Sequence, residues 1–273
     1  MKKDSAQSLR FIDTHCHIHD SEFAEKFGGD VTAVLFRARA EGVDTCICIG
    51  TDAKSSLEAV AFARTEANVY ATLALHPHEV ALHTESEIDE QFAVLEEILA
   101  EGTGGIVGIG ECGLDYFYHE EELIKTRQRS LLRRHIELAL RYDLPLSFHI
   151  RDAFDDFFKI CDEFKGLRGV VHSFSAGTNE LEGVLSRGLY VGLNGIMTFS
   201  KQTDQLEAAR MVPLEKMVLE TDAPFLTPAP FRGTMCEPKH LRTTASYLAE
   251  LRGEDLEVLA RETTRNATQL FGI

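Results

Sequence analysis

The sequence lacks several features that would define other classes of protein. No apolar run approaches the roughly 20 residues of a membrane span, and residues 1–8 are polar, without the apolar centre of a secretory signal. The six cysteines are scattered without a Cys-x-x-Cys pair, and Cys46 and Cys48 lie in an apolar run, which favours buried free thiols. These absences predict a cytoplasmic protein in a reducing compartment, with no membrane partner.

The sequence also carries too little positive charge to coat a nucleic acid through a broad basic face. Its 273 residues include 28 lysines and arginines against 44 aspartates and glutamates, a net charge of −16. This balance still permits an enzyme that grips one or a few phosphates through metal ions and a local arginine. No linker, low-complexity tract or change in composition divides the chain, so we expect a single domain over residues 1–273.

Short apolar runs recur along the whole chain. Each has the length of a strand, and their near-continuous apolar character suits parallel strands that are buried on both faces. The runs are FIDTH, TCICIG, VYATLALH, GIVGIGE, LPLSFH, GVVH, LYVGLN and MVLETD, beginning at Phe11, Thr45, Val69, Gly105, Leu144, Gly169, Leu189 and Met217.

Helical patterns separate these runs and close the chain. They are predicted over Val31–Glu41, Ile88–Glu101, Leu123–Arg141, Phe154–Phe164, Gln202–Val212, His240–Arg252 and Leu256–Leu270. In the third of them we expect Arg127, Arg129, Arg133 and Arg134 to face solvent. Eight strands alternating with helices over roughly 250 residues predict an α/β fold, a (β/α)₈ TIM barrel. An open doubly wound sheet is the competing architecture, but no Gly-x-Gly-x-x-Gly follows any strand.

Side chains that bind metals follow the predicted strands. His15 and His17 are spaced i, i+2, so in an extended segment they point to the same side. The rest of the set ends four more of the runs: Glu111, His149, His172 and Asp222. Because the carboxyl ends of barrel strands meet at one face, we expect one cup, in which four imidazoles and two carboxylates suffice for two divalent ions.

Such ions would serve hydrolysis. A bound divalent ion lowers the pKa of its water from about 15.7 toward about 7, and two ions about 3.5–4 Å apart can clamp the attacking and leaving oxygens of a phosphoryl displacement. We expect Glu111 to bridge the ions, because a carboxylate has two oxygens. Asp222 is expected to bind one ion and to accept a proton from the attacking water. A carboxylate at a strand end is often only a helix N-cap, and it is the recurrence at five strands that favours a metal site.

Further polar residues lie near the same strand ends. His76 and Arg151 are candidates to bind substrate, and the planar guanidinium of Arg151 suits a phosphate, with a salt bridge as the alternative. Asp115 and Glu220 are candidates to orient the metal ligands, although Glu220 can equally belong to the barrel wall. His78 is expected to be a loop residue.

At these residues the sequence resembles the TatD family of metal-dependent deoxyribonucleases, within the metallo-dependent hydrolase barrels. The matching motifs are Asp13-Thr-His-Cys-His17, His76-Pro-His78, Gly110-Glu-Cys-Gly-Leu-Asp-Tyr116, His149-Ile-Arg-Asp-Ala153, His172-Ser-Phe-Ser175, Glu220-Thr-Asp-Ala-Pro224, Arg232-Gly233 and Asn266-Ala-Thr-Gln-Leu-Phe271. The resemblance implies His15, His17 and Asp222 on one ion, His149 and His172 on the other, and Glu111 shared. Cys112, Ala176 and Cys236 depart from the family pattern without removing a ligand, which leaves substrate preference open.

The resemblance implies a hydrolase that cleaves phosphodiester bonds of DNA, with RNA as a further substrate, in the 3′ to 5′ direction from single-stranded ends. Two alternatives stay open: an amide or carboxyl-ester hydrolase of the same superfamily, for example a D-aminoacyl-tRNA deacylase, and a non-enzymatic metal-binding barrel. The expected cofactors are two divalent metal ions. Imidazoles favour zinc or manganese, whereas magnesium prefers oxygen ligands.

Overall fold

The computed structural model of the protein describes residues 9–26 and 30–273. Eight parallel strands stand in the order β1 to β8, and each pairs with the next strand along the chain. The strands are β1 (Phe11–Cys16), β2 (Val43–Ile49), β3 (Val69–Leu73), β4 (Ile106–Asp115), β5 (Leu146–Arg151), β6 (Gly169–Val171), β7 (Tyr190–Leu193) and β8 (Met217–Leu219).

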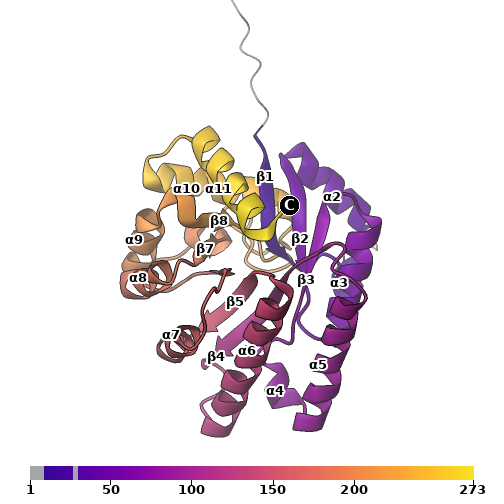
Figure 1. Cartoon of the computed structure of the whole chain (residues 1–273). Helices are drawn as coiled ribbons and strands as arrows, with labels where there is room; N and C mark the ends of the chain where they lie inside the picture. Colours follow the sequence, from indigo (N-terminus) through magenta and orange to yellow (C-terminus); the bar gives the residue numbers. More distant parts are fainter. Residues whose placement is uncertain (1–8, 27–29) are drawn as a thin grey trace, which may run out of the picture.

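Helices surround these strands (Figure 1). The α-helices are α1 (Ser21–Lys26), α2 (Val31–Ala40), α3 (Ala53–Thr65), α4 (Glu79–Leu82), α5 (Glu85–Ala100), α6 (Glu122–Tyr142), α7 (Phe154–Asp162), α8 (Thr178–Ser186), α9 (Thr203–Met211), α10 (Leu241–Arg252) and α11 (Leu256–Phe271). Three short 3₁₀ turns are η1 (Gly195–Thr198), η2 (Leu214–Lys216) and η3 (Pro238–His240). A parallel sheet with helices on its outer face is the predicted (β/α)₈ barrel.

The barrel closes between β1 and the segment that follows β8. Cys16 and Ala223 form a parallel bridge. The backbone N–H of His17 donates to the carbonyl of Ala223 at 2.7 Å, and that of Asp222 donates to the carbonyl of His15 at 2.8 Å. These bonds bring residues from the two ends of the sequence into contact at the mouth of the barrel.

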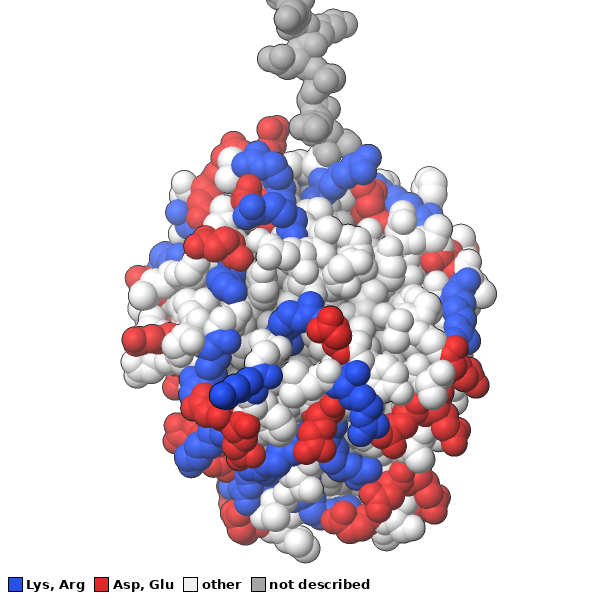
Figure 2. Space-filling model, viewed as in Figure 1, with Lys and Arg blue, Asp and Glu red and all other residues white. Residues whose placement is uncertain are grey.

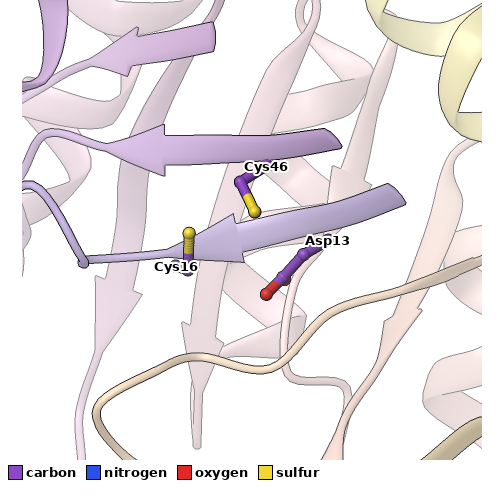
Figure 3. A group of neighbouring side chains, drawn as sticks. All are labelled: Asp13, Cys16 and Cys46. Carbon is purple, nitrogen blue, oxygen red and sulfur yellow. The ribbon is translucent and has the colours of Figure 1, made fainter. Parts of the chain in front are cut away.

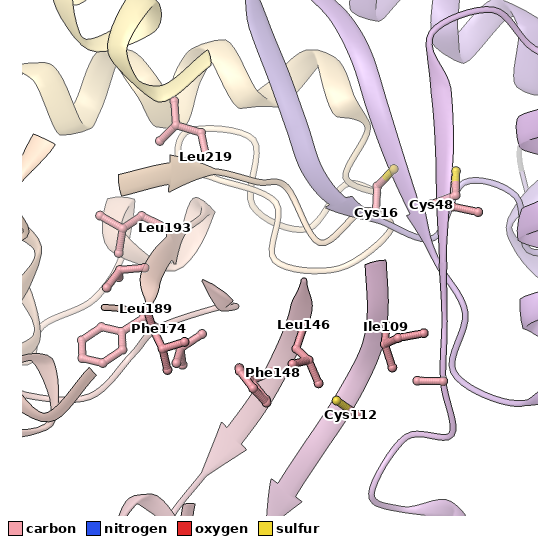
Figure 4. Packing of buried hydrophobic residues seen from close by; sticks show 14 of the residues in the cluster. Cys16, Cys48, Ile109, Cys112, Leu146, Phe148, Phe174, Leu189, Leu193 and Leu219 are labelled. Atoms are coloured by element: carbon pink, nitrogen blue, oxygen red, sulfur yellow. The ribbon is translucent and has the colours of Figure 1, made fainter. Parts of the chain in front are cut away.

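Alternate residues of a strand face the helices and the barrel interior. On β5, Phe148 packs against Phe157 of α7, with ring centroids 5.0 Å apart. The next residue, His149, faces inward, with Nδ1 2.6 Å from a carboxylate oxygen of Glu111. Buried apolar side chains from the strands form the main core with those of the helices (Figure 4). Because this core is close-packed, it also sets the direction of the inward-facing polar side chains.

The eight predicted strands and the seven predicted helices are all present, with their ends shifted by a few residues. The structure adds α3 and α8, and the short α1 and α4. In α3, the sequence AKSSLEAVAFART has too few large apolar residues for a clear stripe. The start of α3 does carry a local signal, an aspartate N-cap, since the side chain of Asp52 accepts a hydrogen bond from the backbone N–H of Ser55.

One strand differs from its prediction in a way that matters for the site. The fourth apolar run was expected to end at Glu111, but β4 continues to Asp115. The extension forms because β4 stays paired with β5, with Cys112 opposite Phe148 and Asp115 opposite Arg151. Glu111 therefore lies inside the strand, on the barrel wall, where its backbone N–H donates to the carbonyl of Gly50 at 3.1 Å.

Charged side chains of both signs are interspersed on the face seen in Figure 2. Five arginines of α6 lie within ion-pair distance of carboxylates, among them Arg129 with Asp156, Arg133 with Glu163 and Arg134 with Asp89. Arg127 does not face solvent as expected, because its guanidinium turns inward and donates to the carbonyl of His83 at 2.8 Å. Through these pairings α6, an outer helix, neutralises acidic side chains of neighbouring segments. No helix in the described part of the chain is long and apolar enough to cross a membrane.

Candidate metal centre

A cavity of about 760 Å³ opens at the carboxyl ends of the strands. Its wall includes five of the six predicted ligands: His17, Glu111, His149, His172 and Asp222. The sixth, His15, is fully buried, and its ring stacks on that of His172 with centroids 3.8 Å apart. The structure therefore gathers all six side chains at one place, as the predicted strand positions require.

Glu111 lies at the centre of this group. Its Oε1 is 2.6 Å from Nδ1 of His149 and 2.9 Å from Nε2 of His172. Its Oε2 is 3.4 Å from Nε2 of His15 and 3.9 Å from Nε2 of His17. Each carboxylate oxygen thus faces its own pair of imidazoles, which is the arrangement expected of a carboxylate shared between two ions.

Asp222 lies beside His15 and His17, and these three side chains form the first group of candidate metal ligands. Oδ1 of Asp222 is 3.6 Å from Nε2 of His15 and 3.4 Å from Nε2 of His17, and the two imidazole nitrogens are 3.3 Å apart. Two atoms that each lie about 2.0–2.2 Å from one tetrahedral ion are roughly 3.4 Å from one another. The spacing of these donors therefore fits a single bound cation.

The second group of candidate metal ligands surrounds Oε1 of Glu111. Besides His149 and His172, His76 lies there, with Nε2 3.6 Å from Oε1. One ligand atom each from His76, Glu111 and His149 lies within 4.8 Å of the other two. His76, predicted to bind substrate, is thus close enough to Glu111 to serve either a substrate or an ion.

Hydrogen bonds from behind hold several imidazoles in place. Nδ1 of His17 lies 3.1 Å from the carbonyl of Ile49, so an N–H there leaves Nε2 for the cavity. The carboxylate of Asp115 lies 2.9 Å from Nε2 of His78 and 3.2 Å from Nε2 of His149. His78 lies in a loop, as expected, and also lines the cavity. The i, i+2 spacing of His76 and His78 was the one sequence signal for the contact between His78 and Asp115.

The buried carboxylates of the cluster favour the binding of cations. Burial would raise the pKa of Glu111, but the surrounding imidazoles hold it well below its ordinary value. Burial would lower the pKa of His172, but Glu111 and Glu220 raise it well above its ordinary value. Asp222 likewise keeps a lowered pKa despite its burial, because His17, His15 and His172 stabilise its charge. Buried carboxylates of this kind need positive charge nearby, which divalent ions would supply.

Asp13, Cys16 and Cys46 form another cluster of metal-type side chains, on β1 and β2 (Figure 3). The carboxylate of Asp13 is already engaged, because it accepts hydrogen bonds from the backbone N–H of Thr221 at 2.9 Å and from its hydroxyl at 2.5 Å. Burial raises the pKa of Asp13 to about 7. These bonds tie β1 to the segment after β8, and so connect the strand of His15 with the segment of Asp222.

All six cysteines are buried free thiols, as predicted for Cys46 and Cys48. The departures Cys112 and Cys236 belong to this set, and the thiol of Cys112 faces the carbonyl of Ser147 at 3.8 Å. Burial raises the pKa of Cys112 well above its ordinary value. Both residues therefore fill packed space and do not reach the cavity.

Arg151 stands at the rim of the cavity. The alternative of a salt bridge is wrong. Among the described residues, no carboxylate lies within ion-pair distance of the Arg151 guanidinium. The guanidinium carbon instead lies 3.8 Å from the ring centroid of Phe117 and 5.0 Å from that of Tyr118. Stacking of this kind leaves the N–H groups at the edge of the guanidinium available for an anion.

Comparison with known proteins identifies the family of the chain. The family model described as TatD related DNase matches residues 12–272. The chain is 33% identical to the uncharacterized metal-dependent hydrolase YabD of Bacillus subtilis over 264 residues, which cover 96% of this chain and 99% of YabD. It is also 33% identical, over 91% of its length and 96% of the relative's, to the 3′-5′ ssDNA/RNA exonuclease TatD of Erwinia amylovora.

A solved structure has the same fold. The crystal structure of YjjV, a TatD homologue from Escherichia coli, superposes with a TM-score of 0.88 and 31% sequence identity, covering 98% of this chain and all of that one. With the family match over almost the whole sequence and the His, Glu and Asp cluster in one cavity, the chain is a member of the TatD-related DNase family and a metal-dependent hydrolase.

Proposed function

We propose that the protein is a phosphodiesterase that removes nucleotides from single-stranded ends of DNA, with RNA as a second substrate, and that it uses two divalent ions. The observation that carries this proposal is the placement of Glu111, whose two oxygens face two different pairs of imidazoles at the base of an open cavity. Similarity to the Erwinia exonuclease supports the substrate and the 3′ to 5′ direction.

In this proposal His15, His17 and Asp222 hold one ion, His149 and His172 hold the other, and Glu111 is shared. Two ions bound there would supply the Lewis acidity that activates water and stabilises the charge developing on the phosphate. The imidazole-rich donor set favours zinc or manganese over magnesium.

The chain's own side chains perform the remaining steps. Oδ1 of Asp222 faces the imidazoles of His15 and His17, which leaves its second oxygen to accept a proton from the attacking water. Arg151 is positioned at the rim to bind a phosphate oxygen through two parallel N–H donors. His76, deeper in the cavity, keeps a neutral imidazole because burial lowers its pKa to about 4, so it can donate one hydrogen bond to the substrate.

The test combines metal analysis with a nuclease assay. Purified protein should contain close to two equivalents of metal, a chelator should abolish release of nucleotides from an end-labelled single-stranded oligonucleotide, and added Zn²⁺ or Mn²⁺ should restore it. Glu111→Gln should lose metal and lower kcat by about 100-fold or more.

The matched control is Glu182→Gln, which removes an exposed carboxylate from α8, and it should behave as the wild type. Full metal content and full activity in Glu111→Gln would overturn the proposed centre. Hydrolysis of a D-aminoacyl-tRNA ester by a metal-loaded protein that leaves oligonucleotides intact would overturn the proposed substrate.

A further inference from the structure

Large aromatic side chains are exposed on two sides of the cavity that holds the candidate metal centre. Phe225 follows β8 and Tyr118 follows β4, and each is 60% exposed. Both line the cavity. In a barrel whose eight strands pair in sequence order, β4 and β8 are opposite one another, so the two rings face the centre from opposite sides.

The position of Phe225 is set by the metal-binding segment itself. Its backbone N–H donates to the carbonyl of Asp222 at 2.8 Å, which closes a tight turn. Its ring stands edge-on to that of His17, with centroids 6.3 Å apart. The exposed ring is thus next to the first group of predicted ligands.

On the opposite side, Tyr118 belongs to a stack that includes a cation. Its ring is perpendicular to that of His78, with centroids 5.4 Å apart. The guanidinium of Arg151 lies against Phe117 and Tyr118, and Phe117 is itself 54% exposed. This arrangement holds the guanidinium at the rim while keeping its hydrogen-bond donors for a ligand.

Exposed rings of this size leave apolar surface in water, which a bound ligand could cover. Because Arg151 and the candidate ions attract negative charge, the ligand that suits all three features is both anionic and planar aromatic. A nucleotide has this chemistry. An unpaired base presents both of its faces for stacking, whereas a base inside a duplex has its faces covered by its neighbours.

Resting on the proposed function, we propose that Phe225 and Tyr118 form two stacking sites for unpaired nucleobases, one on each side of the phosphate that is cleaved, and that Arg151 binds the phosphate next to Tyr118. Every base has a π-face, so these sites select unpaired ends and do not read base identity. The rings thereby supply affinity that the acidic surface of the protein does not.

The test compares removal of a ring with removal of a base. Phe225→Ala should raise KM for end-labelled oligothymidylate by about 5- to 150-fold, whereas Phe225→Tyr, which keeps the ring, should stay within about twofold. Abasic residues at the cleaved end should raise the KM of the wild type similarly. Because Phe225→Ala and the abasic end remove the same contact, combining them should raise KM little more than either change alone. Oligodeoxyadenylate and oligothymidylate should be cleaved with similar KM.

Phe231→Ala is the matched control, because Phe231 is also an exposed aromatic (44%) but lines a different hollow. It should leave KM unchanged. A KM for Phe225→Ala within twofold of the wild type, or effects of ring and base that simply multiply, would overturn the stacking sites.

Binding of a fluorescent phosphorothioate oligothymidylate, measured by anisotropy, separates this inference from the proposed function. Ring-dependent binding without cleavage of ordinary oligonucleotides supports the stacking sites and overturns the phosphodiesterase. Cleavage that is insensitive to the rings overturns the stacking sites alone. Absence of both binding and cleavage by the metal-loaded wild type overturns both.

Discussion

Glu220 offers a sharp test of how the second group of predicted ligands is held. It is fully buried. Its Oε1 accepts a hydrogen bond from the backbone N–H of Ser173 at 2.5 Å and lies 3.3 Å from Nδ1 of His172, at ion-pair distance without hydrogen-bond alignment. A carboxylate at Nδ1 favours the tautomer that leaves Nε2 for a metal ion. We therefore predict that Glu220→Gln weakens one metal site and spares the other.

The size of the effect follows from the kind of contact. Loss of an outer partner of a metal ligand typically costs 10- to 100-fold in metal affinity. The carboxamide keeps the volume of Glu220 but removes its charge, so we expect a 10- to 100-fold weaker second ion. The first ion, beside His15, His17 and Asp222, should keep its affinity.

Gly192→Ala reaches the same contact from another direction. A Cβ at Gly192 would lie 2.4 Å from Oε2 of Glu220, so the carboxylate must shift from the position in which it lies beside His172. Gly104→Ala is the matched control, because a Cβ there meets no heavy atom within 4 Å. Affinities come from competition titrations of Zn²⁺ against a chromophoric chelator, and circular dichroism checks the fold.

Two results would refute this reasoning. The first is wild-type affinity for both ions in Glu220→Gln. The second is an equal loss at both sites together with a lowered melting temperature, since that pattern indicates general destabilisation of the barrel. Loss confined to one site at an unchanged melting temperature is the expected outcome.

Three further outcomes can be measured independently of activity. Burial lowers the pKa of His135 to about 3, and its Nε2 accepts the backbone N–H of Leu75 at 3.0 Å. The contribution of the neutral imidazole to the free energy of unfolding is therefore complete above pH 6.5 and is lost by about 1.4 kcal/mol per pH unit as the pH falls toward 3. The free energy of unfolding, measured with urea, should therefore depend on pH more steeply in the wild type than in His135→Gln over that window. Parallel plots of this free energy against pH would contradict the prediction. Gly113→Ala should cost more than about 2 kcal/mol in unfolding free energy, because a Cβ there would lie 1.9 Å from the carbonyl oxygen of His149, and an unchanged melting curve would show that the strands can move apart. The six buried thiols should react with a disulfide reagent only after denaturation, and rapid titration of any of them in the native protein would show that the interior opens.

The identities of the gathered residues could be read from the sequence because each signal is local. His15 and His17 follow a short apolar run with the period of a strand, and Asp222 and His172 follow others. A barrel brings such positions together whatever the details of its packing, so all six could be grouped without knowing a single distance.

Contacts across the barrel could not be read in this way. The pairing of Asp115 with His78 and His149, and of Glu220 with His172, depends on the register of neighbouring strands. The extension of β4 beyond Glu111 depends on its pairing with β5, and the inward turn of Arg127 on the carbonyls near α4.

The sequence by itself determined the alternation of strands and helices, and with it the barrel and the residues that meet at its mouth, because hydrophobic periodicity is a property of consecutive residues. Only the tertiary structure decided that one oxygen of Glu111 faces each group of imidazoles and that Arg151 stacks on Phe117. The reason is physical: those arrangements are set by side chains distant in sequence, whose separations are defined only after the barrel has closed and its core has packed.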